Sequence, residues 1–136
     1  MLSIVIAAAL ATPAAPANDV LGLWKTETRG GVVQISRCGA SVCGRLVTSD
    51  GLRANPNLKD THNSDAKLRA RPLKGLLVLS GFKADGATWT DGRIYNADDG
   101  KTYAGHMTTT GPRSMKVEGC ALAGLVCRAQ NWTKLN

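Results

Sequence analysis

The sequence has few aromatic residues and almost no histidine, the side chains that often line ligand pockets or act as general bases. It contains three Trp, two Tyr and one Phe, and its histidines are His62 and His106. His62 lies in a basic segment, whereas His106 alternates with Tyr103 and Met107, which places it on the opposite side of a strand. Both histidines are therefore predicted to lie at the surface.

Motifs for catalysis are also missing. Ser41 lies in Gly39-Ala40-Ser41-Val42-Cys43, which is not the turn that presents a nucleophilic serine. No glycine-rich phosphate loop precedes a helix. Several aspartates stand at turn or loop positions, where Asp usually caps the backbone: Asp60, Asp65, Asp98 and Asp99. We therefore predict a protein that is not an enzyme and has no cofactor.

No apolar run is long enough to cross a bilayer as a helix, which takes about 20 residues. The Leu2–Ala11 run is followed by prolines and by the small residues Ala15-Pro16-Ala17, which suit a signal peptidase. We interpret residues 1–17 as a signal peptide and residues 18–136 as one domain, periplasmic or secreted. Because no Lys or Arg precedes the run, a buried N-terminal strand or helix is the alternative.

Four cysteines follow the leader, and an oxidising compartment would join them as disulfides. Their spacings, C-x4-C and C-x6-C, do not match the usual zinc patterns, so no metal site is predicted. Strand alternation places all four side chains on the outward face, which favours two local bridges. Long-range pairing is not excluded on energy. The predicted bridges are Cys38–Cys43 and Cys120–Cys127.

The formal net charge is +7, and residues 1–17 hold no ionisable side chain. The irregular stretch Asp50–Gly75 contains six basic and three acidic residues. A basic surface favours anionic partners, and nucleic acid is not expected because aromatics are not interleaved with the basic residues. The expected partner is an anionic envelope component, with a solvated surface as the alternative. The residues predicted to bind it are Arg53, Lys67, Arg69 and Arg71.

The rest of the chain consists of short apolar or β-branched runs that end at Gly, Asp or Asn, a pattern typical of strands. Tight turn signals such as Asp85-Gly86 join consecutive runs, so neighbours must be antiparallel. Eight such strands predict an up-and-down barrel with one long loop between the third and fourth. The predicted strands are Leu21–Thr28, Val32–Arg37, Val42–Thr48, Leu76–Lys83, Thr88–Tyr95, Lys101–Thr109, Ser114–Cys120 and Val126–Lys134.

The predicted fourth strand begins Leu76-Leu77-Val78-Leu79 and is apolar on both faces, so something outside the barrel should cover it. A short helical turn capped by Ser64 or Asp65 within the long loop is suited to that place.

Several segments resemble a family of secreted bacterial proteins, the domain of unknown function 2147. The matching segments run in order along the chain: Gly22-Leu23-Trp24-Lys25-Thr26, Val32-Val33-Gln34-Ile35, Cys43-Gly44-Arg45, Leu68-Arg69-Ala70-Arg71-Pro72-Leu73-Lys74-Gly75-Leu76, Gly92-Arg93-Ile94-Tyr95, Gly100-Lys101-Thr102-Tyr103 and Cys127-Arg128-Ala129-Gln130-Asn131-Trp132-Thr133. Asn96-Ala97 stand where the family usually has Asp-Pro. The resemblance implies a lipocalin-like (calycin-like) barrel and no established reaction.

The Gly22-x-Trp24 start is similar to the opening of lipocalins, in which a late basic residue packs over the Trp. Arg128 is the predicted counterpart here. Aromatic side chains with polar tips suit a cavity that orients a ligand, although filling of the core is the alternative. The residues predicted to bind a small, partly apolar ligand inside the barrel are Trp24, Tyr95, Tyr103, Trp132 and Arg128. The alternative function is an envelope interaction through the 50–75 loop, with a filled barrel.

Overall fold

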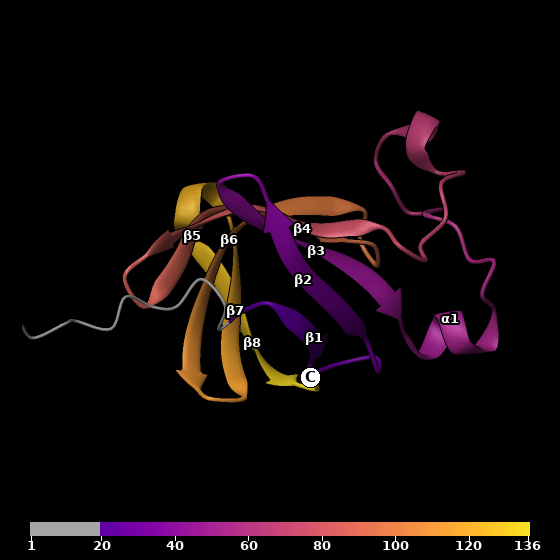
Figure 1. Cartoon of the computed structure of the whole chain (residues 1–136). Coiled ribbons are helices and arrows are strands. Elements are labelled where there is room, and N and C mark those ends of the chain that lie inside the picture. Colours follow the sequence, from indigo (N-terminus) through magenta and orange to yellow (C-terminus); the bar gives the residue numbers. More distant parts are fainter. Residues whose placement is uncertain (1–19) are drawn as a thin grey trace, which may run out of the picture.

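Eight strands follow one another in the computed structural model, which describes residues 20–136 (Figure 1). Each strand pairs antiparallel with the next, and β8 pairs with β1 through Trp24–Lys134 and Lys25–Thr133, which closes the barrel. The predicted up-and-down barrel is confirmed, and the signal-peptide prediction lies outside the described residues. The strands are β1 Gly22–Lys25, β2 Val32–Cys38, β3 Ser41–Thr48, β4 Leu77–Asp85, β5 Thr88–Asn96, β6 Lys101–Gly111, β7 Ser114–Ala121 and β8 Val126–Lys134.

Within residues 20–136 helical structure is limited to three short pieces, two of which lie in the long loop between β3 and β4 at one side of the barrel (Figure 1). The helix α1, Asp50–Ala54, starts where the Ser49 hydroxyl accepts a hydrogen bond from the Leu52 amide at 3.1 Å. The single turn η1, Ala66–Leu68, is capped by Asp65 as predicted, and η2, Leu122–Gly124, lies between β7 and β8. No helix among residues 20–136 is both long and apolar enough to cross a membrane.

The inward side chains form one apolar cluster. The largest of them, Trp24 and Phe82, are 1% and 0% exposed. Burying such side chains stabilises the fold by roughly 2–3 kcal/mol each. The cluster also contains Val20, Val33, Ile35, Val42, Leu79, Trp89, Met107, Met115, Val117 and Trp132.

Three glycines form a row across the inner face of neighbouring strands, because Gly92 pairs with Gly105 and Gly105 pairs with Gly119. The Phe82 ring fills the space that side chains at Gly92 and Gly105 would need. A Cβ atom on Gly105 would lie 2.8 Å from the ring, and one on Gly92 would overlap it. The row therefore lets one large aromatic ring pack directly against the backbone of β5 and β6.

The first strand is shorter than predicted. It ends at Lys25, and Thr26 and Thr28 lie in the following turn, where the Thr26 hydroxyl donates to the Thr28 carbonyl at 2.8 Å. The reason is local, since this side chain satisfies a backbone carbonyl that would otherwise pair with a neighbouring strand.

Both predicted disulfides are present, and each joins neighbouring strands. Cys120 and Cys127 are directly opposite one another on β7 and β8, with Cα atoms 4.1 Å apart. Cys38 and Cys43 close the β2–β3 turn, with Cα atoms 5.8 Å apart. The four cysteines were predicted on the outward face of their strands, and two of them, Cys43 and Cys120, are nevertheless covered, at 7% and 6% exposure. In each bridge one sulfur-bearing side chain is covered and its partner is exposed.

The basic residue over Trp24 is Lys134, so the assignment of that position to Arg128 is wrong. The Lys134 ammonium lies 5.7 Å from the Trp24 ring centroid, and the indole nitrogen donates to the Val20 carbonyl at 2.9 Å. Register explains the correction. Trp24 is paired with Lys134, whereas Arg128 lies six residues earlier on β8, opposite Gly119.

Candidate functional site

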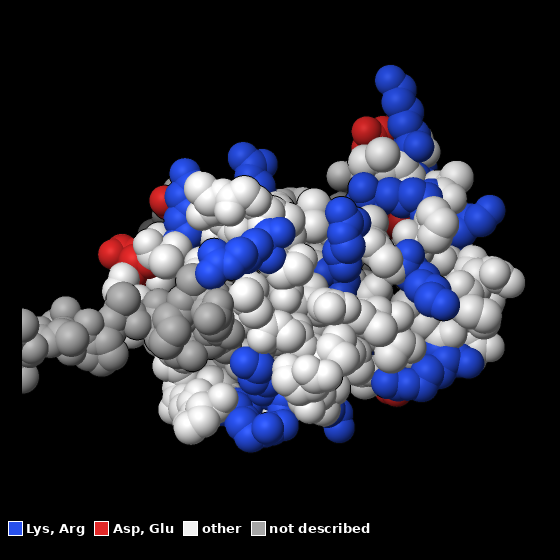
Figure 2. Space-filling model, viewed as in Figure 1, with Lys and Arg blue, Asp and Glu red and all other residues white. Residues whose placement is uncertain are grey.

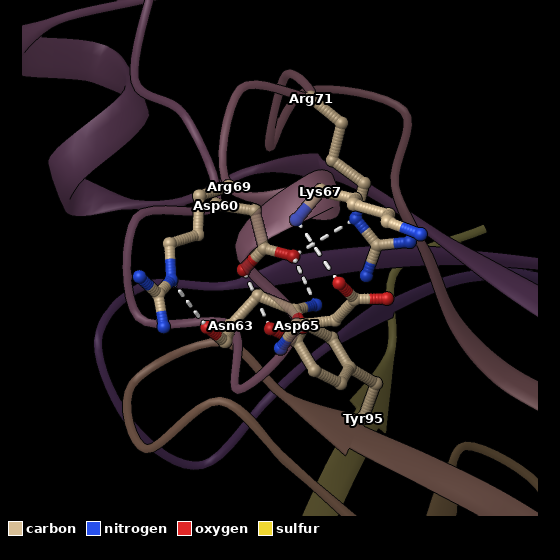
Figure 3. A network of polar contacts seen from close by, with 7 residues as sticks. All are labelled: Asp60, Asn63, Asp65, Lys67, Arg69, Arg71 and Tyr95. Carbon is tan, nitrogen blue, oxygen red and sulfur yellow. Dashed lines mark hydrogen bonds and ion pairs between the residues drawn. The ribbon is translucent and has the colours of Figure 1, made fainter.

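The long loop is organised around a buried carboxylate, Asp60, which is 1% exposed (Figure 3). One of its oxygens accepts a hydrogen bond from the Tyr95 hydroxyl at 2.6 Å. The other accepts from the Asn63 amide at 2.9 Å and from the Arg71 Nε at 2.8 Å. The Arg71 guanidinium also lies over the Tyr95 ring, 5.2 Å from its centroid. Asp60 therefore fixes Arg71 and Tyr95 side by side where the loop meets β5.

The protonation states follow from these contacts. Burial alone would raise the pKa of Asp60, but hydrogen bonds from Tyr95, Asn63 and Arg71, together with the positive charge of Arg71, hold this pKa below its ordinary value. Burial and the hydrogen bond to Asp60 raise the pKa of Tyr95. At neutral pH the centre is therefore a carboxylate with a neutral phenol and a guanidinium.

A second set of contacts holds the loop segment around Asn63. The Asn63 carbonyl accepts from the Arg69 Nε at 2.8 Å, and the Asn63 side chain accepts from the Asp65 amide at 2.8 Å. The Ser64 amide donates to the Gly100 carbonyl in the β5–β6 turn at 3.4 Å. Gly100 has a left-handed backbone with φ of 72°, and a side chain there would overlap the His62 carbonyl. The loop is thus attached to the barrel at the β5–β6 turn as well as at Tyr95.

A concavity of about 520 Å³ lies between the loop and the barrel wall. The loop contributes Asn63, Asp65, Leu68 and Arg71, while the strands contribute apolar and polar groups together. Because Ile94 packs against the core, its neighbours Arg93 and Tyr95 point to the outer side of β5. The wall residues that line the concavity are Leu77, Val78, Ser80, Arg93, Tyr95 and Thr102.

The covering predicted for β4 is only partial. The exposed fractions of Leu76 and Leu79 are 8% and 1%, whereas Leu77, at 37%, faces the concavity together with Val78 and Leu68 of η1. The loop therefore shields the second apolar face of this strand incompletely and leaves an apolar patch inside the concavity.

A smaller concavity of about 380 Å³ adjoins the first one, because Arg93 and Thr102 line both. Within residues 20–136 the Arg93 side chain makes no ion pair or hydrogen bond, and it is exposed. Tyr103 also lines this smaller concavity, and its hydroxyl donates to the Asp99 carboxylate. That hydrogen bond is the main reason why the pKa of Tyr103 is raised.

The five residues predicted to bind a ligand inside the barrel do not form one group. Trp24 and Trp132 belong to the core, at 1% and 6% exposure, and Tyr95 faces the loop. Arg128 is exposed, and its positive charge acts on Tyr103. Of this set, Tyr95 lines the larger concavity and Tyr103 lines the smaller one.

The four basic residues predicted to bind an anionic partner lie on the loop, but three of them are engaged by their own chain. Arg53 donates to the Gly30 carbonyl at 2.9 Å, Arg69 bonds to Asn63, and Arg71 pairs with Asp60. Lys67 is exposed, and its amide donates to Asp65. Among the four, Arg71 lines the larger concavity.

Sequence analysis missed Asp60 and Arg93 as site residues. The sequence analysis assigns Asp60 to a turn. Its hydrogen-bond partners lie 3, 11 and 35 positions away in the chain, so the sequence spacing does not reveal them. The sequence did contain a signal for Arg93. It precedes the apolar Ile94 in a strand, and consecutive strand residues point to opposite faces.

One cluster of metal-ligand types occurs in the described part of the chain. The ligand atoms of Glu118, Cys120 and Cys127 lie within 4.8 Å of one another. Both sulfurs belong to a disulfide, so neither is a thiolate ligand. The cluster therefore does not have the donors that a zinc site needs.

Comparison with known proteins identifies a family and a fold. A family model described as an uncharacterized protein conserved in bacteria (DUF2147) matches residues 22–134. A solved structure described as protein HP1028 from the human pathogen Helicobacter pylori, of the lipocalin family, superposes with a TM-score of 0.78 at 21% identity. The match covers 86% of this chain and 83% of that one. No curated protein matches the sequence.

Proposed function

The chain belongs to the DUF2147 family of uncharacterized bacterial proteins and has a lipocalin-like barrel, and from this premise we propose that it is an exported protein that binds a small, anionic and partly apolar ligand. The ligand binds between the long loop and the outer wall of β4, β5 and β6. The two disulfides support an extracellular or periplasmic location, where such bonds persist.

The position of Arg71 and Tyr95 carries this proposal. Asp60 holds Arg71 through its Nε, which leaves the terminal nitrogens of the guanidinium for another acceptor. A rigidly held arginine loses little conformational entropy when a ligand binds. Arg93 lines the same concavity from β5, has no partner within residues 20–136 and supplies a second positive charge.

The apolar part of the ligand has its own surface. Leu68, Leu77 and Val78 line the concavity beside the two arginines. A site with apolar walls and a few fixed polar groups is typical of small-molecule binding. The interior of the barrel is the weaker alternative, because Trp24, Phe82 and Trp132 occupy it.

The test uses 8-anilinonaphthalene-1-sulfonate, a fluorescent probe with one anionic group and an apolar ring system. We expect Arg93→Ala to weaken its binding by about tenfold, because a charge-assisted contact is lost. Lys116→Ala on β7 removes the same charge from an exposed position outside the concavity and is the matched control. Fluorescence titration gives both dissociation constants.

Equal affinities of the two variants would contradict the proposed site. A loss of affinity in Trp132→Phe but not in Arg93→Ala would place the probe inside the barrel instead. Native mass spectrometry of protein purified from its own host then identifies any ligand that copurifies.

A further inference from the structure

The turn between β7 and β8 presents apolar side chains to solvent. Between Cys120 and Cys127 the chain reads Ala121-Leu122-Ala123-Gly124-Leu125-Val126, without a single polar side chain. The exposed fractions of Leu122, Leu125 and Val126 are 70%, 84% and 49%. The other exposed large apolar side chains of residues 20–136 reach at most 46%, at Leu135. Apolar exposure is therefore concentrated at one tip of the molecule.

The backbone holds this tip in an unusual conformation. Leu122, Ala123 and Gly124 have φ angles of 53°, 55° and 87°. The left-handed conformation costs roughly a few kcal/mol for the two residues that have a Cβ atom together, so it persists only where the surroundings enforce it. The disulfide at the base of the turn and the Leu125 amide, which donates to the Leu122 carbonyl at 3.2 Å, provide that support. The leucines are thus presented on a fixed platform.

The charge around the tip limits what it binds. Arg128 follows the turn immediately after Cys127, and the chain has a net charge of +7. Figure 2 shows more Lys and Arg than Asp and Glu side chains on the face of the molecule that it draws. An exposed apolar turn followed by a basic residue, on a chain of net positive charge, is complementary to a surface with anionic groups outside and hydrocarbon beneath.

We propose that the segment 121–126, which we call the apolar tip, inserts into the surface of a membrane that contains anionic lipid. Leu122 and Leu125 enter the boundary between headgroups and acyl chains, and the basic side chains contact lipid phosphates. A second copy of the chain is the less suitable partner. A stable interface takes about 20–30 residues on each side, and the tip has six.

Cosedimentation with lipid vesicles tests the proposal on the disulfide-bonded protein. We expect binding to phosphatidylcholine vesicles that contain about one third phosphatidylglycerol, weaker binding at high salt, and little binding to pure phosphatidylcholine. The double variant Leu122→Ser/Leu125→Ser should lower the partition coefficient at least about tenfold, because both apolar contacts are lost. Leu135→Ser, an exposed leucine elsewhere, is the matched control and should bind as the parent protein does.

Depth of insertion is measured with Leu125→Trp. Its emission should shift to the blue, and brominated lipid should quench it, when anionic vesicles are added. Absence of vesicle binding by the parent protein would overturn the proposal, and so would equal binding by the double variant. If the double variant instead dissociates a dimer in sedimentation velocity, the tip binds a second copy and the membrane assignment is wrong.

Membrane binding by the apolar tip and ligand binding in the concavity are separate properties, and each has its own test. The double variant at the apolar tip should leave the affinity for 8-anilinonaphthalene-1-sulfonate unchanged. Arg93→Ala should conversely lower vesicle binding by no more than about fivefold, since one basic side chain near an anionic surface contributes about 1 kcal/mol.

Discussion

At the residue scale, Asp60 connects the loop to the barrel. Its two oxygens accept hydrogen bonds from a loop amide, a loop guanidinium and a strand phenol. The buried charge is tolerated because each of these donors compensates part of the lost hydration. Asp60 is therefore the side chain whose replacement should affect loop, concavity and ligand affinity together.

We expect Asp60→Asn to lower the free energy of unfolding by about 3 kcal/mol at neutral pH, because it removes the negative charge that Arg71 pairs with and replaces one acceptor oxygen by an NH2 donor. Asp98→Asn is the matched control. Asp98 pairs with Arg29 at 2.9 Å, close to the 2.8 Å of Asp60 and Arg71, but its side chain is 56% exposed. An exposed pair contributes about 1 kcal/mol at most. Urea unfolding of the two variants measures the difference, and equal losses would contradict a special role for Asp60.

The same carboxylate makes stability depend on pH. The pKa of Asp60 is lower in the folded protein than its ordinary value of 3.8, so the unfolded chain binds more protons in the acidic range. Its stabilising contribution is therefore complete above pH 3.8 and is lost as the pH falls through the folded pKa. In the unfolding experiments just described, the parent protein should lose its advantage over Asp60→Asn in that acidic window. If the difference in free energy of unfolding between the parent protein and Asp60→Asn stays constant with pH, Asp60 does not titrate as described.

The sequence did not predict the Asp60 centre because its geometry is tertiary. Alternation assigns a face to a strand residue such as Tyr95 only when the strand register and its irregularities are known. The aromatic residues were predicted to share a cavity because they are scarce, whereas size and apolarity placed Trp24 and Trp132 in the core. Scarcity of a residue type carries no information about its direction.

At the scale of elements, the glycine row determines how β5 and β6 approach Phe82. The backbone of β4 supports the same arrangement, because Gly81 has a φ of 73° and both Leu79 and Phe82 are buried although they are three positions apart. Regular alternation would place them on opposite faces. The irregularity at Gly81 therefore brings both side chains to the core.

Alanine substitutions along the row should have graded effects. We expect Gly92→Ala and Gly105→Ala each to destabilise the protein by about 3 kcal/mol, because the new methyl group displaces Phe82 or Ile94. Gly119→Ala should change stability by less than about 1 kcal/mol, since its Cβ would lie 3.6 Å from the nearest atoms. Thermal unfolding followed by circular dichroism compares the three variants. Similar melting temperatures across the row would argue against close packing on Phe82.

Seven of the eight strands could be predicted from sequence to within two residues at either end, because turn residues mark their ends. The exception is β1, in which Thr26 forms a side-chain hydrogen bond to the backbone and leaves the sheet. The sequence analysis also missed the helix α1. Five residues contain too little of the helical period to be recognised, although Ser49 provides its cap.

At the scale of the whole molecule, closure depends on a short seam. Two residue pairs join β1 to β8, and the Leu135 amide adds a hydrogen bond to the Leu23 carbonyl at 2.7 Å. Lys134 contributes three contacts. Its amide donates to the Arg113 carbonyl, its carbonyl accepts from the Arg113 guanidinium, and its ammonium lies over the Trp24 ring. Lys134 and Leu135 thus complete the barrel.

Deleting residues 134–136 should lower the free energy of unfolding by about 3 kcal/mol, because several backbone hydrogen bonds and the contact with Trp24 are lost together. The exposed edges of β1 and β8 should also promote self-association. Deleting Asn136 alone is the control. Urea unfolding and sedimentation velocity measure the two effects, and a truncated protein as stable and monomeric as the control would contradict this account of closure.

The topology of the whole molecule was the most predictable feature, since short turns force neighbouring strands together. The concavity was not predictable, because it depends on how a loop of irregular structure folds back onto β4 and β5. The excess of basic residues in that loop marks it in the sequence, but counting charges does not distinguish Arg71, which lines the concavity, from Arg53, which is bound to Gly30.

The disulfide connectivity has a consequence for oxidative maturation. Each cysteine is joined to the next one along the chain, Cys38 to Cys43 and Cys120 to Cys127. An oxidant that acts on thiols in their order along the chain therefore yields the native connectivity directly. Pairing in this order leaves no mispaired intermediate for thiol exchange to correct.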